Sequence, residues 1–470
     1  MDVNLIRNTS WHVFHKRDRS PLMQIFLLST GIYNEEIPID YRVKNMSSFN
    51  GVVAIPLKEK LRLKNILIKE LEEDPKFLLK IMKQCSEMHI EYVNEWREMY
   101  EKVYYSLTSK FLSQKFMEYI HQLANLGFSV TIPLFVEEYL GETVFNKFKN
   151  FFGKDAEKMY AIVLNPIRAG AVLQEEKALL QVCDFNYHQF RFGWMKNVDY
   201  KQEYYPVSYY KKKSSKITNP ESKIQKILEQ RTNEKKIFKD LLKKISKDKF
   251  LVALVKTLNK SIYFRSYRTE IFYSSARFFT PMFKEIGKRL GLANYKDMLY
   301  LYWNEIEQLL NTGKNADQEL IDQRKKGYVF VSDYDGEYTH WEGKEMDDVL
   351  KAFSSSKKNN ISLGSEVIGQ RAYPGKVSGK VCLVNTDSDL KKIKKDDVLV
   401  CHSTNINYVP YLDKVKAIVT EEGGILSHAS MISREMKIVS VVGTNTATKV
   451  FKDGDNIEVD AIKGIVQKVK

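Results

Sequence analysis

The 470-residue sequence is poor in cysteine and has no long apolar run. Its four cysteines, Cys85, Cys183, Cys382 and Cys401, are scattered without the spacing of metal ligands, which suits a reducing compartment. No stretch approaches the roughly 18 apolar residues of a membrane span. The N-terminus has no apolar core before a cleavage site. We therefore expect a cytoplasmic protein that does not interact with a membrane.

The sequence also lacks a recognisable nucleotide-binding motif and internal repeats. No Gly-x-x-x-x-Gly-Lys-Ser/Thr run of a phosphate-binding loop is present. Hydrophobic residues make up 43% of the chain and aromatic residues 12%, which indicates a folded protein rather than a disordered one. A chain of this length is expected to form two or three domains.

Helical periodicity dominates the first two thirds of the chain. Apolar residues recur at helical spacing between 57 and 126, and residues 221–312 are strongly helical. Pro133 is expected to interrupt the chain after the first of these regions, and Pro281 is expected to break or kink the second.

The net charge of +15 is unevenly distributed along the chain. Residues 211–260 hold 16 Lys and Arg against 5 Asp and Glu, an excess of +11. Such an excess can bind nucleic acid, but it also describes a solvated, lysine-rich helix face. We favour the solvated face, because no nucleic-acid-binding module accompanies the charge and lysine outnumbers arginine.

The most informative stretch runs from Thr420 to Glu435 and reads as strand, glycine turn and helix. Residues 415–419 supply the strand, and Gly423 and Gly424 allow a tight turn. Ser427 is a good N-cap for a helix that begins at His428.

A histidine in this position is suited to carrying a phosphoryl group. The positive end of the helix dipole disfavours imidazolium, so the His428 ring tends to stay neutral and nucleophilic. The N–H groups of the helix start and of the glycine turn can bind phosphate. An isolated Ser-His pair would more often be an ordinary first helical turn, so the interpretation depends on the surrounding pattern.

That pattern resembles the phosphohistidine swivelling domain of phosphoenolpyruvate-utilising enzymes, such as phosphoenolpyruvate synthase, pyruvate phosphate dikinase and rifampicin phosphotransferase. The family's run is Thr-x-x-Gly-Gly-x-x-Ser-His-x-x-x-x-x-Arg-Glu, followed by Gly-Ile-Pro-x-Val-Val-Gly. Lys437 and Val439 replace the usual glycine and proline. The matching residues are Thr420, Gly423, Gly424, Ser427, His428, Arg434, Glu435, Ile438, Val441, Val442 and Gly443.

The resemblance implies an α+β multidomain fold: a large, mostly helical N-terminal domain followed by a small β/β/α swivelling phosphohistidine domain. We place the helical acceptor-binding domain at 1–350, with a break near 205–220 that would divide it into two subdomains. A linker is expected at 351–368, and the swivelling domain at 369–470.

The resemblance also implies a function. In this family an ATP-grasp domain phosphorylates the histidine from ATP, the swivelling domain carries the phosphoryl group, and a third domain presents the acceptor. No ATP-grasp domain is recognisable here. We therefore predict a phosphotransferase component of a split dikinase, inactive without an ATP-grasp partner that binds ATP and magnesium. This chain would bind no cofactor or metal itself, and AMP and phosphate would be the co-products.

Each motif residue then has an expected role. His428 would be phosphorylated and would pass the group to a small-molecule acceptor. Gly423, Gly424 and Ser427 would hold the phosphate, while Thr420 and Arg434 would orient or neutralise it. The alternative is a non-catalytic protein that binds a ligand or partner and regulates, with a retained swivelling domain.

The acceptor pocket is predicted from weaker signals. Arg17 could contact an anion, and His188, Arg191 and Trp194 lie where larger relatives place a histidine-containing loop. Arg265 and Arg268 would share a helical face and form an anion clamp. Surface arginines and a buried, hydrogen-bonded histidine are the competing interpretations.

Overall fold

The computed structural model describes residues 3–16, 21–24, 45–100, 104–182, 184–197, 202–332, 338–356 and 365–469. By Cα packing the chain divides into two compact units that interleave along the sequence. Unit 1 comprises Met1–Val136, Ala171–Ile224 and Tyr267–Lys358. Unit 2 comprises Glu137–Gly170, Gln225–Ser266 and Asn359–Lys470. The last domain therefore packs with two helical segments that are distant in sequence.

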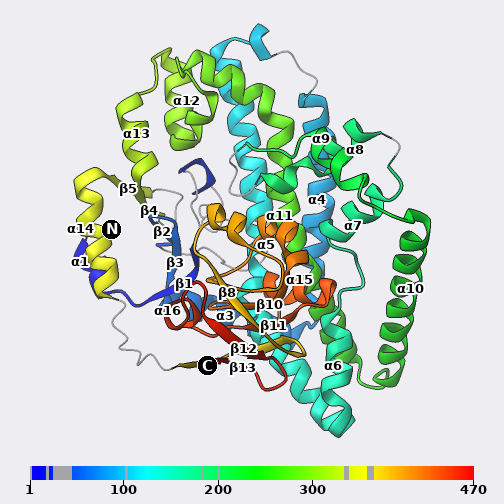
Figure 1. The fold of residues 1–470 in the computed structure, drawn as a ribbon. Coiled ribbons are helices and arrows are strands. Elements are labelled where there is room, and N and C mark those ends of the chain that lie inside the picture. The colour runs from blue at the N-terminus through cyan, green and yellow to red at the C-terminus, as the bar shows by residue number, and fades with distance from the viewer. Residues whose placement is uncertain are drawn as a thin grey trace. The chain divides into compact units, whose positions relative to one another are not determined.

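Unit 1 contains a five-stranded antiparallel sheet in the order β1-β3-β2-β4-β5. Helices α1 and α14 lie side by side and cover it (Figure 1). Phe49 of the sheet stacks on Phe353 of α14, with 3.9 Å between the ring centroids. The strands are β1 (Trp11–Lys16), β2 (Ser47–Phe49), β3 (Val52–Pro56), β4 (Tyr328–Ser332) and β5 (Tyr338–Glu342).

The rest of unit 1 is helical. The apolar stripes expected between residues 57 and 126 form the buried faces of α3 and α4, which include Leu67, Leu71, Leu78 and Ile81. The helices confined to this unit are α1 (Val3–Asn8), α3 (Leu57–Glu73), α4 (Phe77–Tyr100), α7 (Ala171–Leu179), α8 (Phe185–Phe192), α9 (Val207–Ser214), α12 (Trp303–Thr312), α13 (Gln318–Lys326) and α14 (Gly343–Ser355).

A buried arginine ties the C-terminal part of unit 1 to its sheet. Arg324 of α13 is 1% exposed and donates to both carboxylate oxygens of Glu305 and to Glu342 at the end of β5. Its guanidinium also lies over the ring of Tyr302, 4.5 Å from the centroid. A buried cation is tolerated here because two carboxylates and a carbonyl satisfy its donors.

Three long helices pass through both units. They are α5 (Ser109–Phe152), α10 (Pro220–Lys244) and α11 (Lys249–Arg289). α5 continues through Pro133 and α11 continues through Pro281, so the interruptions expected at these prolines do not end either helix. Packing along a long helix can offset the one backbone hydrogen bond that a proline removes.

Unit 2 is built around an eight-stranded sheet in the order β6-β13-β12-β8-β9-β10-β11-β7. Strands β8, β9, β10 and β11 are parallel, and their neighbours on either side are antiparallel. The strands are β6 (Glu366–Ile368), β7 (Gln370–Tyr373), β8 (Lys376–Val384), β9 (Asp397–Cys401), β10 (Val415–Thr420), β11 (Val439–Val442), β12 (Asn456–Asp460) and β13 (Ile465–Lys468).

The helix of the histidine motif connects two parallel strands. α15 (His428–Met436) follows β10 and precedes β11, so these elements form a βαβ unit. β10 is buried at five of its six residues, as expected for a strand inside a parallel sheet. Unit 2 also contains α6 (Ala156–Leu164) and α16 (Ala447–Val450).

The expected fold class is confirmed: the protein is α+β, with a large helical N-terminal region and a C-terminal β domain. The sequence did not reveal the sheet formed by β1 to β5 within the helical region. The expected linker at 351–368 overlaps two elements, because α14 extends to Ser355 and β6 begins at Glu366. Within the described ranges, no helix is sufficiently long and apolar to span a membrane.

Candidate functional site

The loop between β10 and α15 has the backbone that its glycines predict. Gly423 has a φ of +100°, and a Cβ there would lie 2.6 Å from Ser427 Cβ, so only glycine fits. The side chain of Ser427 accepts a hydrogen bond from the N–H of Ser430 at 3.2 Å. The predicted N-cap and the start of the helix at His428 are thereby confirmed.

Two hydroxyl groups that are expected at the phosphate form hydrogen bonds within this loop. Ser427 Oγ donates to Ser430 Oγ at 3.1 Å, and Ser430 Oγ donates to the carbonyl of Gly424 at 2.8 Å. Thr420 is fully buried, and its Oγ1 donates to the carbonyl of Glu422 at 2.7 Å. These residues shape the backbone before His428, and their direct contact with phosphate stays a prediction.

A second glycine allows β11 to approach the loop closely. Gly443 follows β11 with a φ of +70°, and a Cβ at this position would lie 2.7 Å from the carbonyl oxygen of Gly423. Thr444, the next residue, donates from both N–H and Oγ1 to the carbonyl of Thr420. Gly443 therefore lets the end of β11 pack directly against the glycine turn, and Thr444 fixes this contact by its hydrogen bonds.

The imidazole of His428 is oriented by a threonine from the adjacent strand end. His428 is half-buried, and its Nδ1 lies 2.9 Å from Thr404 Oγ1. When the ring proton is on Nδ1, the imidazole donates to Thr404 and the lone pair is on Nε2. Nε2 is therefore the nitrogen that we expect to act as nucleophile.

A second histidine lies at the same edge of the sheet, within an acidic pair. His402 Nδ1 is 2.9 Å from Glu421 Oε2, and its Nε2 is 3.1 Å from Glu422 Oε1, the latter in poor hydrogen-bond alignment. The hydrogen bond with Glu421 and the close contact with Glu422 raise the pKa of His402 to about 9, against the opposing effect of burial. The imidazole is therefore cationic at neutral pH.

Glu421 is the buried member of this cluster. Burial raises its pKa, but hydrogen bonds from His402 and Thr448 outweigh burial, so the pKa is lowered overall. Thr448 donates to Glu421 Oε1 from its N–H at 2.9 Å and from its Oγ1 at 2.6 Å. Glu421 thus links the loop to α16 and keeps a positive charge beside the glycine turn.

Arg434 lies on α15, and the structure places its guanidinium against the loop. Its Nη1 donates to the carbonyl of Ile425 at 2.8 Å. Arg434 follows His428 by six residues, which is about 9 Å along the axis and 240° around it. Its expected role as neutraliser of the phosphate stays a prediction.

Several residues of the predicted acceptor pocket have structural partners. His188 is 3% exposed, its Nε2 is 3.2 Å from Glu175 Oε1, and its ring meets that of Tyr210 edge-on. Trp194, in the 3-10 helix Gly193–Lys196, is 2% exposed. His188 therefore has the environment of a buried, hydrogen-bonded histidine.

The arginines expected at the acceptor have different environments. Arg191 is exposed and its guanidinium lies over the ring of Phe192, 4.9 Å from the centroid. Arg265 pairs with Glu137 at 2.5 Å, and Arg268 is half-buried on the same helix, α11. Arg17 lies outside the described residues.

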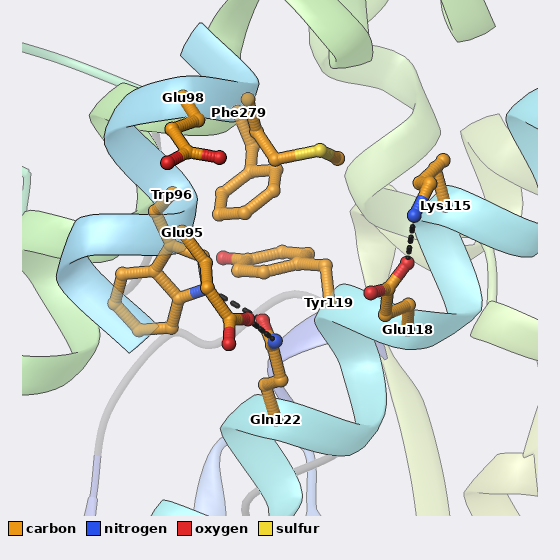
Figure 2. Close-up of a pocket in the computed structure, with 9 residues that line it drawn as sticks. Glu95, Trp96, Glu98, Lys115, Glu118, Tyr119, Gln122 and Phe279 are labelled. Atoms are coloured by element: carbon orange, nitrogen blue, oxygen red, sulfur yellow. Dashed lines mark hydrogen bonds and ion pairs between the residues drawn. The ribbon is translucent and has the colours of Figure 1, made fainter. Parts of the chain in front are cut away.

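Unit 1 has a cavity of about 190 Å³ that none of these predicted residues lines (Figure 2). Its rim carries three exposed carboxylates, from Glu95, Glu98 and Glu118, and one of them pairs with Lys115. The cavity is also lined by Trp96, Met99, Tyr119, Gln122 and Phe279. The aromatic side chains among them are at most 1% exposed, and the acidic rim disfavours a phosphorylated ligand.

Sequence reasoning missed His402 and Thr404 as site residues. Both follow β9, which is buried and lies parallel to β10. Because parallel neighbours end at the same edge of a sheet, the side chains after β9 lie beside the loop after β10. The polar run Cys401-His402-Ser403-Thr404 after a buried strand was the available signal.

Comparisons with known proteins agree with this geometry. Residues 393–464 match the family model described as "PEP-utilising enzyme, mobile domain". The chain is 34% identical over 197 residues to a probable phosphoenolpyruvate synthase from Pyrococcus abyssi, which covers 39% of this chain and 23% of that protein. It is 35% identical over 198 residues to the phosphoenolpyruvate synthase of Pyrococcus furiosus, and this match covers 39% of this chain and 24% of that protein.

A bacterial relative gives a similar match. An uncharacterized phosphotransferase, YvkC, from Bacillus subtilis is 30% identical over 201 residues, which covers 42% of this chain and 24% of that protein. The chain thus spans about a quarter of the length of these relatives. A structural match to aconitase X of Thermococcus kodakaraensis has 18% identity and a TM-score of 0.18, covers 23% of this chain and all of that chain, and is too distant to support an argument.

The close approach at Gly443 can be tested by substitution. Gly443→Ala is expected to lower the free energy of unfolding by at least about 2 kcal/mol, because the new Cβ adds a clash to the unfavourable φ. Gly454 is a matched control, since its φ is +88° and a Cβ there meets nothing within 4 Å. Gly454→Ala should cost about 1 kcal/mol in the same thermal unfolding measurement. Equal losses would contradict the proposed contact.

The raised pKa of His402 predicts a pH-dependent stability. Because the folded protein holds this proton more tightly than the unfolded chain, the stabilisation is complete below the ordinary pKa of 6.5 and disappears as the pH rises through about 9. We expect a loss of about 1–2 kcal/mol across that range, reduced by solvent screening because the side chain is one third exposed.

Urea unfolding at several pH values would measure this effect. His402→Gln should flatten the profile between pH 6.5 and 9, because glutamine does not titrate. His121, an exposed histidine on α5, is the control, and His121→Gln should leave the profile unchanged. An unaltered profile in His402→Gln would show that another group is responsible.

Proposed function

We propose that this chain, whose residues 393–464 match the mobile domain of phosphoenolpyruvate-utilising enzymes, is the phosphoryl carrier of a split phosphotransferase. A separate ATP-grasp protein would bind ATP and magnesium and phosphorylate His428. The carrier would then pass the phosphoryl group to a small-molecule acceptor bound by the helical region. The similarity to phosphoenolpyruvate synthases supports the phosphotransfer chemistry, and the split arrangement is our own proposal.

The observation that supports this proposal best is the hydrogen bond between His428 Nδ1 and Thr404 Oγ1. With the threonine hydroxyl as acceptor, this bond holds the ring proton on Nδ1 and leaves the lone pair on Nε2. In the first step, that lone pair forms an N–P bond while the bond from the same phosphorus to its leaving oxygen breaks. The proton remains on Nδ1, where Thr404 continues to accept it.

The second step is the reverse displacement on a different nucleophile. An oxygen or nitrogen of the acceptor forms a bond to phosphorus, the N–P bond breaks, and the electron pair returns to Nε2. Such transfers depend mainly on positioning and charge neutralisation. The half-buried ring of His428 is held at the N-terminus of α15, and this placement provides the positioning.

The proposal predicts a labelled histidine. Incubation with an ATP-grasp partner and ATP labelled at the β and γ phosphates should place an acid-labile, base-stable label on His428. His428→Ala should carry none, because no other residue would replace the Nε2 nucleophile. Label that persists in this variant would refute the assignment, and absence of label from the unaltered protein with all candidate partners would favour a non-catalytic binding protein.

A second variant separates orientation from chemistry. Thr404→Val keeps the shape of the side chain but cannot accept from Nδ1, so the required tautomer loses its stabilisation. We expect the rate of labelling to fall by about tenfold or more, in line with the loss of about 1.5 kcal/mol for one hydrogen bond. Thr446→Val, at another threonine of the same domain, should leave the rate close to that of the unaltered protein.

A further inference from the structure

The buried hydrogen-bond donors of unit 2 that have no partner include groups of two residues. They are the guanidinium of Arg434, through Nε and Nη2, and the hydroxyl of Tyr160 on α6. Tyr160 is 7% exposed. Arg434 as a whole residue is only half-buried, but Nε and Nη2 are sealed from solvent. Buried polar groups without a partner are rare in folded proteins, so two of them together require an explanation.

The two groups lie close to one another. A methyl group at Gly141 of α5 would lie 2.9 Å from Tyr160 Oη and 3.8 Å from Leu426 Cδ1. Leu426 directly follows Ile425, whose carbonyl accepts from Arg434 Nη1. Burial raises the pKa of Tyr160 and lowers that of Arg434 to about 10, and each group also acts electrostatically on the pKa of the other.

The neighbouring carboxylates leave these donors unsatisfied. Glu435 is adjacent in sequence and raises the pKa of Arg434 through its charge, and Glu142, exposed on α5, raises that of Tyr160 in the same way. Nε and Nη2 form no hydrogen bond with either carboxylate. A buried cation without a hydrogen-bonded anion costs several kcal/mol. The arrangement therefore has the donors of an anion site.

We propose that Arg434 and Tyr160 form a binding site for a small oxyanion, a phosphate or a carboxylate group. Nε and Nη2 lie on one edge of the guanidinium and present two parallel N–H groups, the arrangement that binds two oxygens of one oxyanion. The hydroxyl of Tyr160 supplies a third donor from a different helix. Gly141 provides space beside the hydroxyl, because any side chain there would meet it.

Such an anion would join the phosphohistidine helix to the helical part of the same unit. Contacts between these parts include a hydrogen bond from Ser266 Oγ to Met431 Sδ at 3.0 Å and an ion pair between Arg371 and Glu157 at 2.9 Å. An anion held by Arg434 and Tyr160 would add charge-assisted hydrogen bonds to these contacts. Its binding would therefore stabilise the seating of α15 against α6 and α5, and would require no phosphorylation of His428.

The experiment uses the full chain and inorganic phosphate as the probe. Melting temperature and isothermal titration calorimetry are followed with increasing phosphate, with chloride at equal ionic strength as the reference. We expect a saturable rise in melting temperature, because a ligand that binds only the folded state stabilises it. A parallel titration with acetate distinguishes a phosphate site from a carboxylate site. The absence of saturable binding of either anion would show that water satisfies these donors, and would overturn the proposal.

Conservative variants locate the site. Tyr160→Phe and Arg434→Lys should each weaken anion binding by about tenfold or more, because each loses hydrogen bonds to a charged group. Lysine can still donate to Ile425, and phenylalanine keeps the packing of Tyr160, so both variants should fold. Tyr187→Phe and Arg371→Lys, at exposed side chains, are the matched controls and should bind as the unaltered protein does.

One further variant separates this site from the glycine turn. His428→Ala should retain the full response to phosphate if the anion binds at Arg434 and Tyr160. A response that is lost in His428→Ala but kept in Tyr160→Phe would place the anion at the turn and overturn this inference. That outcome would leave the proposed phosphohistidine intact, so the two proposals fail separately.

Discussion

The hydrogen bond between Thr404 and the Nδ1 of His428 is the interaction on which the chemistry of the site depends. An imidazole has two nitrogens of similar basicity, and only an external partner decides which of them keeps the lone pair. The partner comes from the end of the adjacent parallel strand, so the sheet positions the hydroxyl that can hold the proton on Nδ1. A change in the register of β9 against β10 would displace Thr404, and the imidazole of His428 would lose its hydrogen-bond partner at Nδ1.

The same edge of the sheet concentrates the other groups that shape the loop. Gly423 and Gly443 let two backbone segments meet, and Glu421 fixes the loop to α16 while it holds the cationic His402. Ser427, Ser430, Thr420 and Glu421 thus form hydrogen bonds within this part of the domain. The site achieves rigidity through these internal bonds, which suits a reaction that needs exact placement of a phosphoryl group.

The sequence predicted the local elements of the site better than their surroundings. Glycine at Gly423 and an N-cap at Ser427 follow from backbone chemistry that operates over a few residues, so they could be read directly. The pairing of His188 with Glu175 depends on packing between helices, and the sequence could not determine it. The five-stranded sheet was missed for the same reason, since its strands come from both ends of the helical region.

The interleaved composition of unit 2 has a consequence for biosynthesis. A ribosome completes 137–170 and 225–266 long before it makes 359–470, the segment with which they pack. Until then, the apolar faces of α6 and of the adjoining part of α11 lack their final neighbours in the nascent chain. Long-range contacts of this kind slow folding and leave aggregation-prone surface exposed. The order of synthesis thus leaves these helices without their packing partners until the last segment of unit 2 has been made.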